Sequence, residues 1–166
     1  MSEPALHPDV AVVATLLGTW SGEGAGSYPT IPSFRYAETV TFGHIGKPFL
    51  AYAQRTRALG DDGVAGLPLH AEAGYLRVPG AGRAEWVLAQ PSGIAEIQEG
   101  TVERVDGIVV LTLRSTQVAL TSSAKSVTAV ERTLRVEGDV LTYTLAMAAV
   151  GEGMTHHLQA TLHRQD

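Results

Sequence analysis

Cysteine is absent from this chain of 166 residues. The absence excludes disulfide bridges, catalysis by a thiolate, zinc ribbons, iron–sulfur clusters and cofactor attachment through a C-x-x-C-H motif. A chain without cysteine also fits a reducing compartment, and we therefore expect a cytoplasmic protein.

Basic charge and long apolar runs are also scarce. The chain has 12 Lys and Arg against 17 Asp and Glu, which gives a net charge of −5. Nucleic-acid binding needs clustered Lys and Arg to neutralise phosphates, so we expect no nucleic-acid partner. No apolar run approaches the roughly 20 residues of a membrane-spanning helix. The acidic start MSEPALHPDV lacks the basic region of a signal peptide, so we expect neither a signal peptide nor a membrane partner.

The length of the chain suits one domain over residues 1–166. We predict one short helix near the start, over 8–17, because Pro8 and Asp9 suit its first turn and Gly18 suits its end. Its apolar face is expected to comprise Ala11, Leu16 and Leu17. The helix is too short to be stable alone, so it must either cap one end of the molecule or join a dimer interface.

Alternating stretches bounded by turn residues predict about ten strands after the helix. The predicted strands cover residues 19–28, 34–44, 49–59, 69–79, 83–91, 94–104, 107–114, 126–137, 140–150 and 154–164. Only the connections 59–68 and 115–125 are long. Because no helices alternate with the strands, a parallel sheet is disfavoured. The pattern predicts an all-β, ten-stranded antiparallel up-and-down β-barrel, and a barrel of ten strands should enclose a pocket.

Glycines are concentrated in the first predicted strand, GTWSGEGAGSY. Gly18, Gly22, Gly24 and Gly26 share one face of an extended strand, and Trp20 lies between them on that face. Missing side chains let a strand bend or let another group approach its backbone. We expect a bend at a barrel corner with Trp20 as a plug of the barrel floor, rather than direct contact between these glycines and a ligand.

Other short motifs have ordinary explanations when taken singly. The stretch GEGAG neither follows a buried strand nor opens a helix, which excludes a nucleotide-binding loop. The S-x-x-K match SSAK has no companion motifs, so a serine acylase is disfavoured. The histidines show no zinc-binding spacing. They are His7, His44, His70, His156, His157 and His163.

Taken in order, the motifs resemble the nitrobindin family over residues 15–165. The matching stretches are GTWSGEG (with Gly18, Trp20, Gly22 and Gly24), YPTI, F-x-Y-x-E, GKPFL, GYLR, PSG-I, AKSVTAVER and HL-x-A-x-LHR. The resemblance implies a ten-stranded barrel with one haem b per chain, bound near its mouth through a single histidine. The matching histidine is His157, which would be the axial ligand of the iron and the catalytic centre. The resemblance also places Lys125 at the haem, facing a propionate, and Thr30, Ile31 and His44 on the distal or rim side.

One local conflict concerns the last strand. Strict alternation puts His156, rather than His157, on the face of Leu158, Ala160 and Leu162. We therefore expect either a β-bulge near this turn or an interior face that carries Gln159, Thr161 and His163.

The resemblance to bacterial nitrobindins implies peroxynitrite isomerase activity. A ferric haem would accept the terminal oxygen of peroxynitrite, and the fragments would rejoin as nitrate. A ferrous haem would bind nitric oxide, so a nitric oxide carrier or sensor is an alternative, and a haem-free barrel carrying an apolar small molecule is another. We expect the rest of the pocket to be poor in acid–base groups, and a homodimer is possible.

Overall fold

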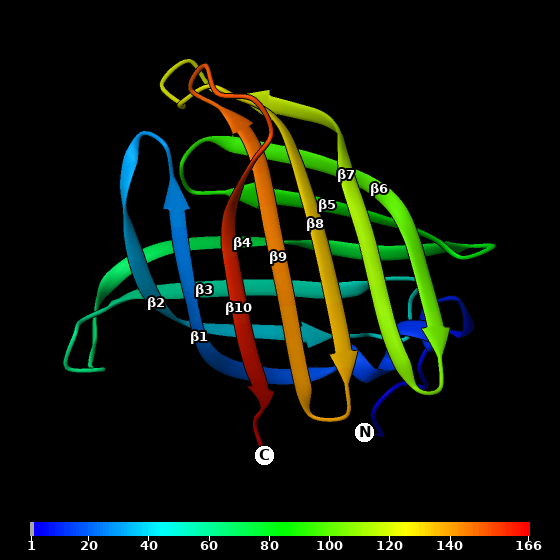
Figure 1. Ribbon diagram of the computed structural model, residues 1–166. Coiled ribbons are helices and arrows are strands. Elements are labelled where there is room, and N and C mark those ends of the chain that lie inside the picture. The colour runs from blue at the N-terminus through cyan, green and yellow to red at the C-terminus, as the bar shows by residue number, and fades with distance from the viewer. Residues whose placement is uncertain (1) are drawn as a thin grey trace.

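The computed structural model describes residues 2–166, which form one 3₁₀-helix followed by ten strands (Figure 1). The elements are η1 (Pro8–Leu16), β1 (Gly18–Tyr28), β2 (Ile31–Gly43), β3 (Leu50–Leu59), β4 (Ala65–Gly80), β5 (Arg83–Gln90), β6 (Ile94–Val105), β7 (Ile108–Leu120), β8 (Val127–Glu137), β9 (Val140–Ala149) and β10 (Thr155–Arg164). Among these described residues, no helix has the length and apolar character to span a membrane.

The strands form one closed antiparallel barrel, as predicted. Each strand pairs with its neighbours in sequence, and β1 pairs with β10 to complete the circle. Two strands are longer than expected: β4 begins at Ala65, and β7 continues to Leu120. Their extra residues, AGLP and STQVAL, lack a clear polar–apolar alternation. Pairing with β3 and β6, with register shifts, keeps them extended all the same.

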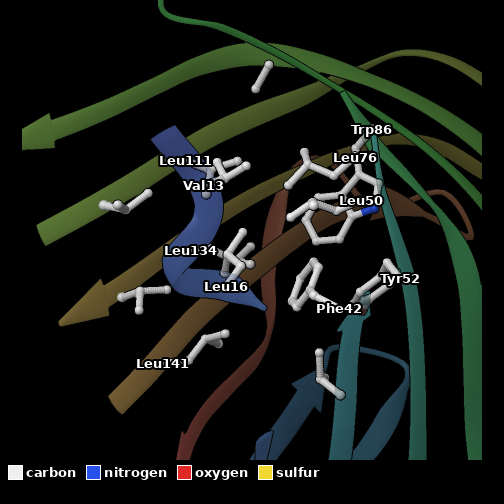
Figure 2. Close-up of a cluster of buried hydrophobic side chains, with 14 of the residues drawn as sticks. Val13, Leu16, Phe42, Leu50, Tyr52, Leu76, Trp86, Leu111, Leu134 and Leu141 are labelled. Carbon is white, nitrogen blue, oxygen red and sulfur yellow. The ribbon is translucent and has the colours of Figure 1, made fainter. Parts of the chain in front are cut away.

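The η1 helix closes one end of the barrel. Val10, Val13 and Leu16 are fully buried, and η1 lies against β4, β6 and β7. Figure 2 shows Val13 and Leu16 among the side chains of the barrel strands. A 3₁₀-helix has three residues per turn, so residues spaced by three lie on one face. Of the expected apolar face of Ala11, Leu16 and Leu17, Leu16 is buried and Leu17 packs partly buried against the core, whereas Ala11 is exposed and was wrongly included.

Trp20 seals the same end of the barrel. Its side chain is fully buried, and its indole Nε1–H donates to the carbonyl oxygen of Leu16 at 2.8 Å. The Arg164 guanidinium lies 4.2 Å from the centre of the Trp20 ring. Arg164 also donates to the carbonyl oxygens of Thr15 and Leu17, at 2.8 Å and 2.6 Å. The plug is thus held to η1 and to the C-terminal strand together.

The β1 glycines make room for protein atoms. A Cβ at Gly22 would meet the backbone of β10 at Thr161. At Gly24 the same space holds the ring of Tyr36, and at Gly26 it holds the ring of Phe34. These glycines therefore let β2 aromatic side chains lie across the inner surface of β1.

The buried face of η1 predicts a large effect of truncating Leu16. We expect Leu16→Ala to lower the free energy of unfolding by about 2–5 kcal/mol, because the barrel strands cannot fill the space it leaves. The matched control is Leu67→Ala, since Leu67 is 81% exposed; its effect should stay within about 0.5 kcal/mol. Chemical denaturation measures both, and equal losses would contradict the role assigned to η1.

Candidate functional site

A cavity of about 760 Å³ occupies the barrel between its open mouth and the end closed by η1. Its mouth is lined from the β1–β2 turn, the β7–β8 loop and the start of β10. Its floor is apolar and includes Phe42, Trp86, Leu134 and Leu141. The volume lies within the roughly 300–1,000 Å³ of sites that enclose cofactor-sized molecules.

His157 lies in a β-bulge and lines this cavity. In the pairing of β10 with β9, His156 is opposite Ala146 and Leu158 is opposite Leu145, so His157 is an extra residue. Both His157 and Leu158 therefore line the cavity, whereas the His156 side chain is exposed on the outside. The bulge expected from the sequence is confirmed, and the alternative of an interior face with Gln159, Thr161 and His163 is excluded.

The contacts of His157 fix its tautomer. Its Nδ1 lies 3.0 Å from the carbonyl oxygen of Ser27. A carbonyl can only accept, so Nδ1 carries the proton and Nε2 keeps its lone pair. The Tyr28 ring packs edge-on at 5.4 Å between centroids. Burial lowers the pKa of His157 below its ordinary value, although the bond to Ser27 acts in the opposite direction. The imidazole is therefore neutral at pH 7, the form that binds a metal.

Three of the other residues expected from the resemblance also line the mouth. Thr30 and Ile31 come from the β1–β2 turn and the start of β2, and Lys125 comes from the loop before β8. All three are exposed at this rim. The structure thus brings Thr30, Ile31 and Lys125 to the same opening as His157, with one cation among them.

His44 does not line the cavity, which corrects its expected place. The 13 residues of β2 run from Ile31 to Gly43, about 40 Å of extended chain, so His44 lies far from the mouth. Its Nδ1 accepts from the backbone N–H of Gly46 at 3.3 Å, and its Nε2 lies 4.0 Å from a Glu3 carboxylate oxygen. Its position indicates a structural role near the N-terminal segment.

The expectation that the pocket is poor in acid–base groups was wrong. A belt of polar side chains lines the cavity between its mouth and its apolar floor. The polar belt comprises Tyr36, Glu38, Tyr52, Gln54, Thr56, His70, Glu72, Glu96, Arg132 and Tyr143. Each position continues the inward alternation of its strand; Glu38, for example, follows Tyr36 and precedes Val40 at spacing two. This spacing of two was the sequence signal that could have revealed the belt, because residues spaced by two share a face of a strand.

Arg132 and Glu72 form the ion pair of the belt. Both are buried, and the guanidinium donates to the carboxylate through two nitrogens, at 2.6 Å and 3.3 Å. The Tyr52 hydroxyl donates to the same carboxylate at 2.7 Å. Burial acts to raise the pKa of Glu72, but the Arg132 charge outweighs it and holds that pKa below its ordinary value. Glu72 is therefore ionised and fully occupied by its partners.

Among residues 2–166, Glu38 has no cationic partner of its own. It accepts hydrogen bonds from the Tyr143 hydroxyl at 2.7 Å and from the Gln54 amide at 3.0 Å. Burial raises the pKa of Glu38 to about 7, although both hydrogen bonds act to lower it. Glu38 therefore exchanges its proton near neutral pH, unlike Glu72 in the same belt.

Comparison with known proteins identifies the family of this chain. A model of the THAP4-like, heme-binding beta-barrel domain matches residues 9–164. The chain belongs to the nitrobindin family of haem-binding β-barrels. The family resemblance drawn from the sequence motifs is thus confirmed.

Close relatives share the whole length of the chain. Peroxynitrite isomerase 1 of Mycolicibacterium paratuberculosis is 56% identical over 160 residues, covering 96% of this chain and 97% of the relative. Peroxynitrite isomerase of Nocardia farcinica is 55% identical, covering 96% and 93%. The crystal structure of Rv2717c from M. tuberculosis superposes with a TM-score of 0.92 at 49% identity, covering 98% of this chain and 100% of that one.

The residues present fit a haem at the mouth. The neutral His157 offers Nε2 to an iron, and its Nδ1–H is already oriented by Ser27, as metal-binding histidines usually are. Lys125 at the rim would face a haem propionate, to which a lysine can donate a charge-assisted hydrogen bond. Apolar side chains beside His157 (Leu158, Leu145 and Val130) would cover the porphyrin faces.

The unusual pKa of Glu38 predicts a specific pH dependence of stability. Between about pH 4.5 and pH 7 the folded chain keeps a proton that the unfolded chain has lost, so stability falls as pH rises through this window. The raised pKa of Glu38 lowers the free energy of unfolding across this window by about 3 kcal/mol at most. We expect Glu38→Gln, which does not titrate, to gain up to that amount relative to wild type between pH 5 and pH 8.

Urea denaturation of the haem-free protein at both pH values measures this gain. Glu23→Gln is the control, because Glu23 is exposed and pairs with Arg35 on the surface. If the free energies of unfolding of Glu38→Gln and of wild type change equally with pH, the raised pKa assigned to Glu38 is wrong.

Proposed function

We propose that this chain is a haem-dependent peroxynitrite isomerase that binds one haem b through His157. The observation that carries the proposal is the neutral imidazole of His157, which a β-bulge turns into a cavity large enough for a cofactor. The high identity to relatives named peroxynitrite isomerase supports the reaction.

Each residue at the mouth has a part in this function. When bound, the haem supplies a ferric Lewis acid for cleavage of the O–O bond of peroxynitrite. His157 holds the iron through Nε2, and the Ser27 carbonyl keeps the ring in the correct tautomer. Lys125 raises the positive potential at the entrance, which favours the approach of an anionic substrate. The apolar wall around Leu158 would exclude water from the space in which the substrate reacts.

The polar belt argues against a cavity built for an apolar cargo. An apolar molecule that filled the cavity would bury Glu38 and Glu96 against hydrocarbon, and both carboxyl groups already have pKa values raised by burial. Such contacts are costly unless hydrogen bonds replace the lost water. A flat cofactor at the mouth leaves the belt free to keep water.

The adjacent histidines provide a matched test of the ligand. We expect His157→Ala to lose the Soret band of the haemin-loaded protein and its acceleration of peroxynitrite decay in stopped-flow measurements. His156→Ala should retain both, because His156 points outward. A His157→Ala protein that binds haemin as tightly as wild type would refute the ligand assignment. A ferric wild-type protein with no effect on decay would refute the isomerase. Nitric oxide binding by the ferrous protein would also depend on His157 as the ligand of the iron. Reduced samples of the same wild-type and variant proteins test this binding.

We also infer a homodimer through the outer face of β3–β7. Adjacent strands place five exposed alanines in one row: Ala53, Ala73, Ala89, Ala95 and Ala119. The next row contains Tyr75, Val87 and Ile97, which are 52%, 43% and 39% exposed. An exposed apolar face of this kind suits a second copy of itself across a twofold axis.

A charge placed in this face should separate the subunits. We expect light scattering to give the mass of a dimer for wild type and of a monomer for Ala73→Arg, because the arginine would be buried without a partner. Thr133→Arg on exposed β8 is the control and should remain dimeric. A monomeric wild type would contradict the inference.

A further inference from the structure

The polar belt contains a chain of two tyrosines that ends on Glu38. The Tyr143 hydroxyl donates to Glu38 Oε2 at 2.7 Å, and the Tyr36 hydroxyl lies 2.7 Å from that of Tyr143. Because the Tyr143 proton points to Glu38, Tyr36 donates to the Tyr143 oxygen. Tyr143 therefore has a base for its proton and a donor to its oxygen, which is the arrangement that eases oxidation of a phenol.

Glu38 is the better base among the carboxylates that face these tyrosines. Glu72 also accepts from a tyrosine, Tyr52, but its charge is neutralised by Arg132 at hydrogen-bond distance. Within the part of the chain that the structure describes, the hydrogen-bond partners of Glu38 are the neutral Tyr143 and Gln54, and Glu72 and Arg132 act on it through space. It therefore holds a proton far more readily than Glu72 does.

Aromatic rings connect this chain to the mouth. The Phe34 ring lies 6.0 Å from that of Tyr36 and 6.2 Å from the ring of His157, centre to centre. Tyr36, Tyr143 and Glu38 line the same cavity as His157. A small oxidising species formed at the mouth thus meets Tyr143 within the cavity.

We propose that Tyr143 is a one-electron reductant built into the cavity, which gives its electron to nitrogen dioxide radical and its phenolic proton to Glu38. The O–H bond of Tyr143 breaks, and an O–H bond forms on the Glu38 carboxylate. Nitrogen dioxide becomes nitrite, and Tyr143 becomes a neutral tyrosyl radical. The inference rests on the proposed function, because O–O cleavage of peroxynitrite supplies nitrogen dioxide that escapes recombination.

The radical has a lasting product. A second nitrogen dioxide couples to the ring carbon next to the oxygen of Tyr143, and the hydrogen displaced from that carbon restores the hydroxyl. The product is 3-nitrotyrosine, so Tyr143 is also a modification site that records leakage of radicals from the reaction.

Peptide mass spectrometry of nitrotyrosine tests the proposal. The haem-loaded protein is treated with peroxynitrite at mildly alkaline pH, where Glu38 is ionised. We expect nitration at Tyr143 to exceed that at Tyr75 in the Ala73→Arg background, where the proposed dimer does not cover Tyr75 and Tyr75 is 52% exposed on the outer surface. Glu38→Gln should lower nitration of Tyr143 severalfold and leave Tyr75 unchanged. Glu96→Gln, which alters a belt carboxylate bonded to Gln90 and Gln98, should change neither.

A second arm separates this inference from the isomerase. The haem-free protein is exposed to nitrogen dioxide generated by radiolysis, which needs no haem, and the same preference for Tyr143 is expected. If peroxynitrite decay is not accelerated but nitration still favours Tyr143, the proposed isomerase function is wrong and the role of Tyr143 as a reductant is supported. Nitration that favours Tyr75 in the Ala73→Arg background, or that is insensitive to Glu38→Gln in the folded variant, overturns the role of Tyr143 as the reductant. The ratio of nitration at Tyr143 to that at Tyr75 in the Ala73→Arg background decides alone if Glu38→Gln does not fold.

Discussion

The pairing of β1 with β10 is the constraint on which the barrel and its site both depend. The ladder runs from Trp20 opposite Arg164 to Gly26 opposite Leu158 and removes the two free edges that an open sheet would expose. Its closed end is fixed by the contacts of Arg164 with η1 and Trp20. At its mouth end the next contact is the hydrogen bond from His157 to Ser27. Closing the barrel therefore also positions the candidate metal ligand.

The cavity is divided by polarity along its length. The mouth carries the imidazole and a lysine, the belt carries carboxylates with one guanidinium, and the floor is apolar. Burying charged groups costs stability unless each finds partners, and Arg132 with Glu72 meets that condition. Glu38 does not, so its proton is exchangeable near pH 7. A buried carboxyl group that costs stability and exchanges its proton near pH 7 is explained better by a role in the chemistry of the cavity than by a role in folding.

Turn residues and alternation were enough to predict ten strands and their order, because tight turns join each antiparallel pair. The same signals failed where tertiary contacts decide the structure. The 65–68 segment lacks alternation and is extended only by pairing with β3. The polar belt escaped prediction because the pocket was expected to be poor in acid–base groups, although Glu38 and Arg132 are each in phase with buried neighbours. The expected place of His44 was wrong because a motif gives the order of residues along the chain, but it does not say at which end of the barrel a strand finishes.

His156 and His157 show why the ligand could not be chosen by periodicity. Leu158, Ala160 and Leu162 must face inward to pack against the core, and alternation back from them selects His156. The bulge adds one residue between His156 and Leu158, which turns His157 inward without moving the apolar face. A bulge costs a ladder hydrogen bond, and the donation from His157 to Ser27 restores a cross-strand link at that point. The bulge that interrupts the alternation of β10 is thus the feature that places His157 in the cavity.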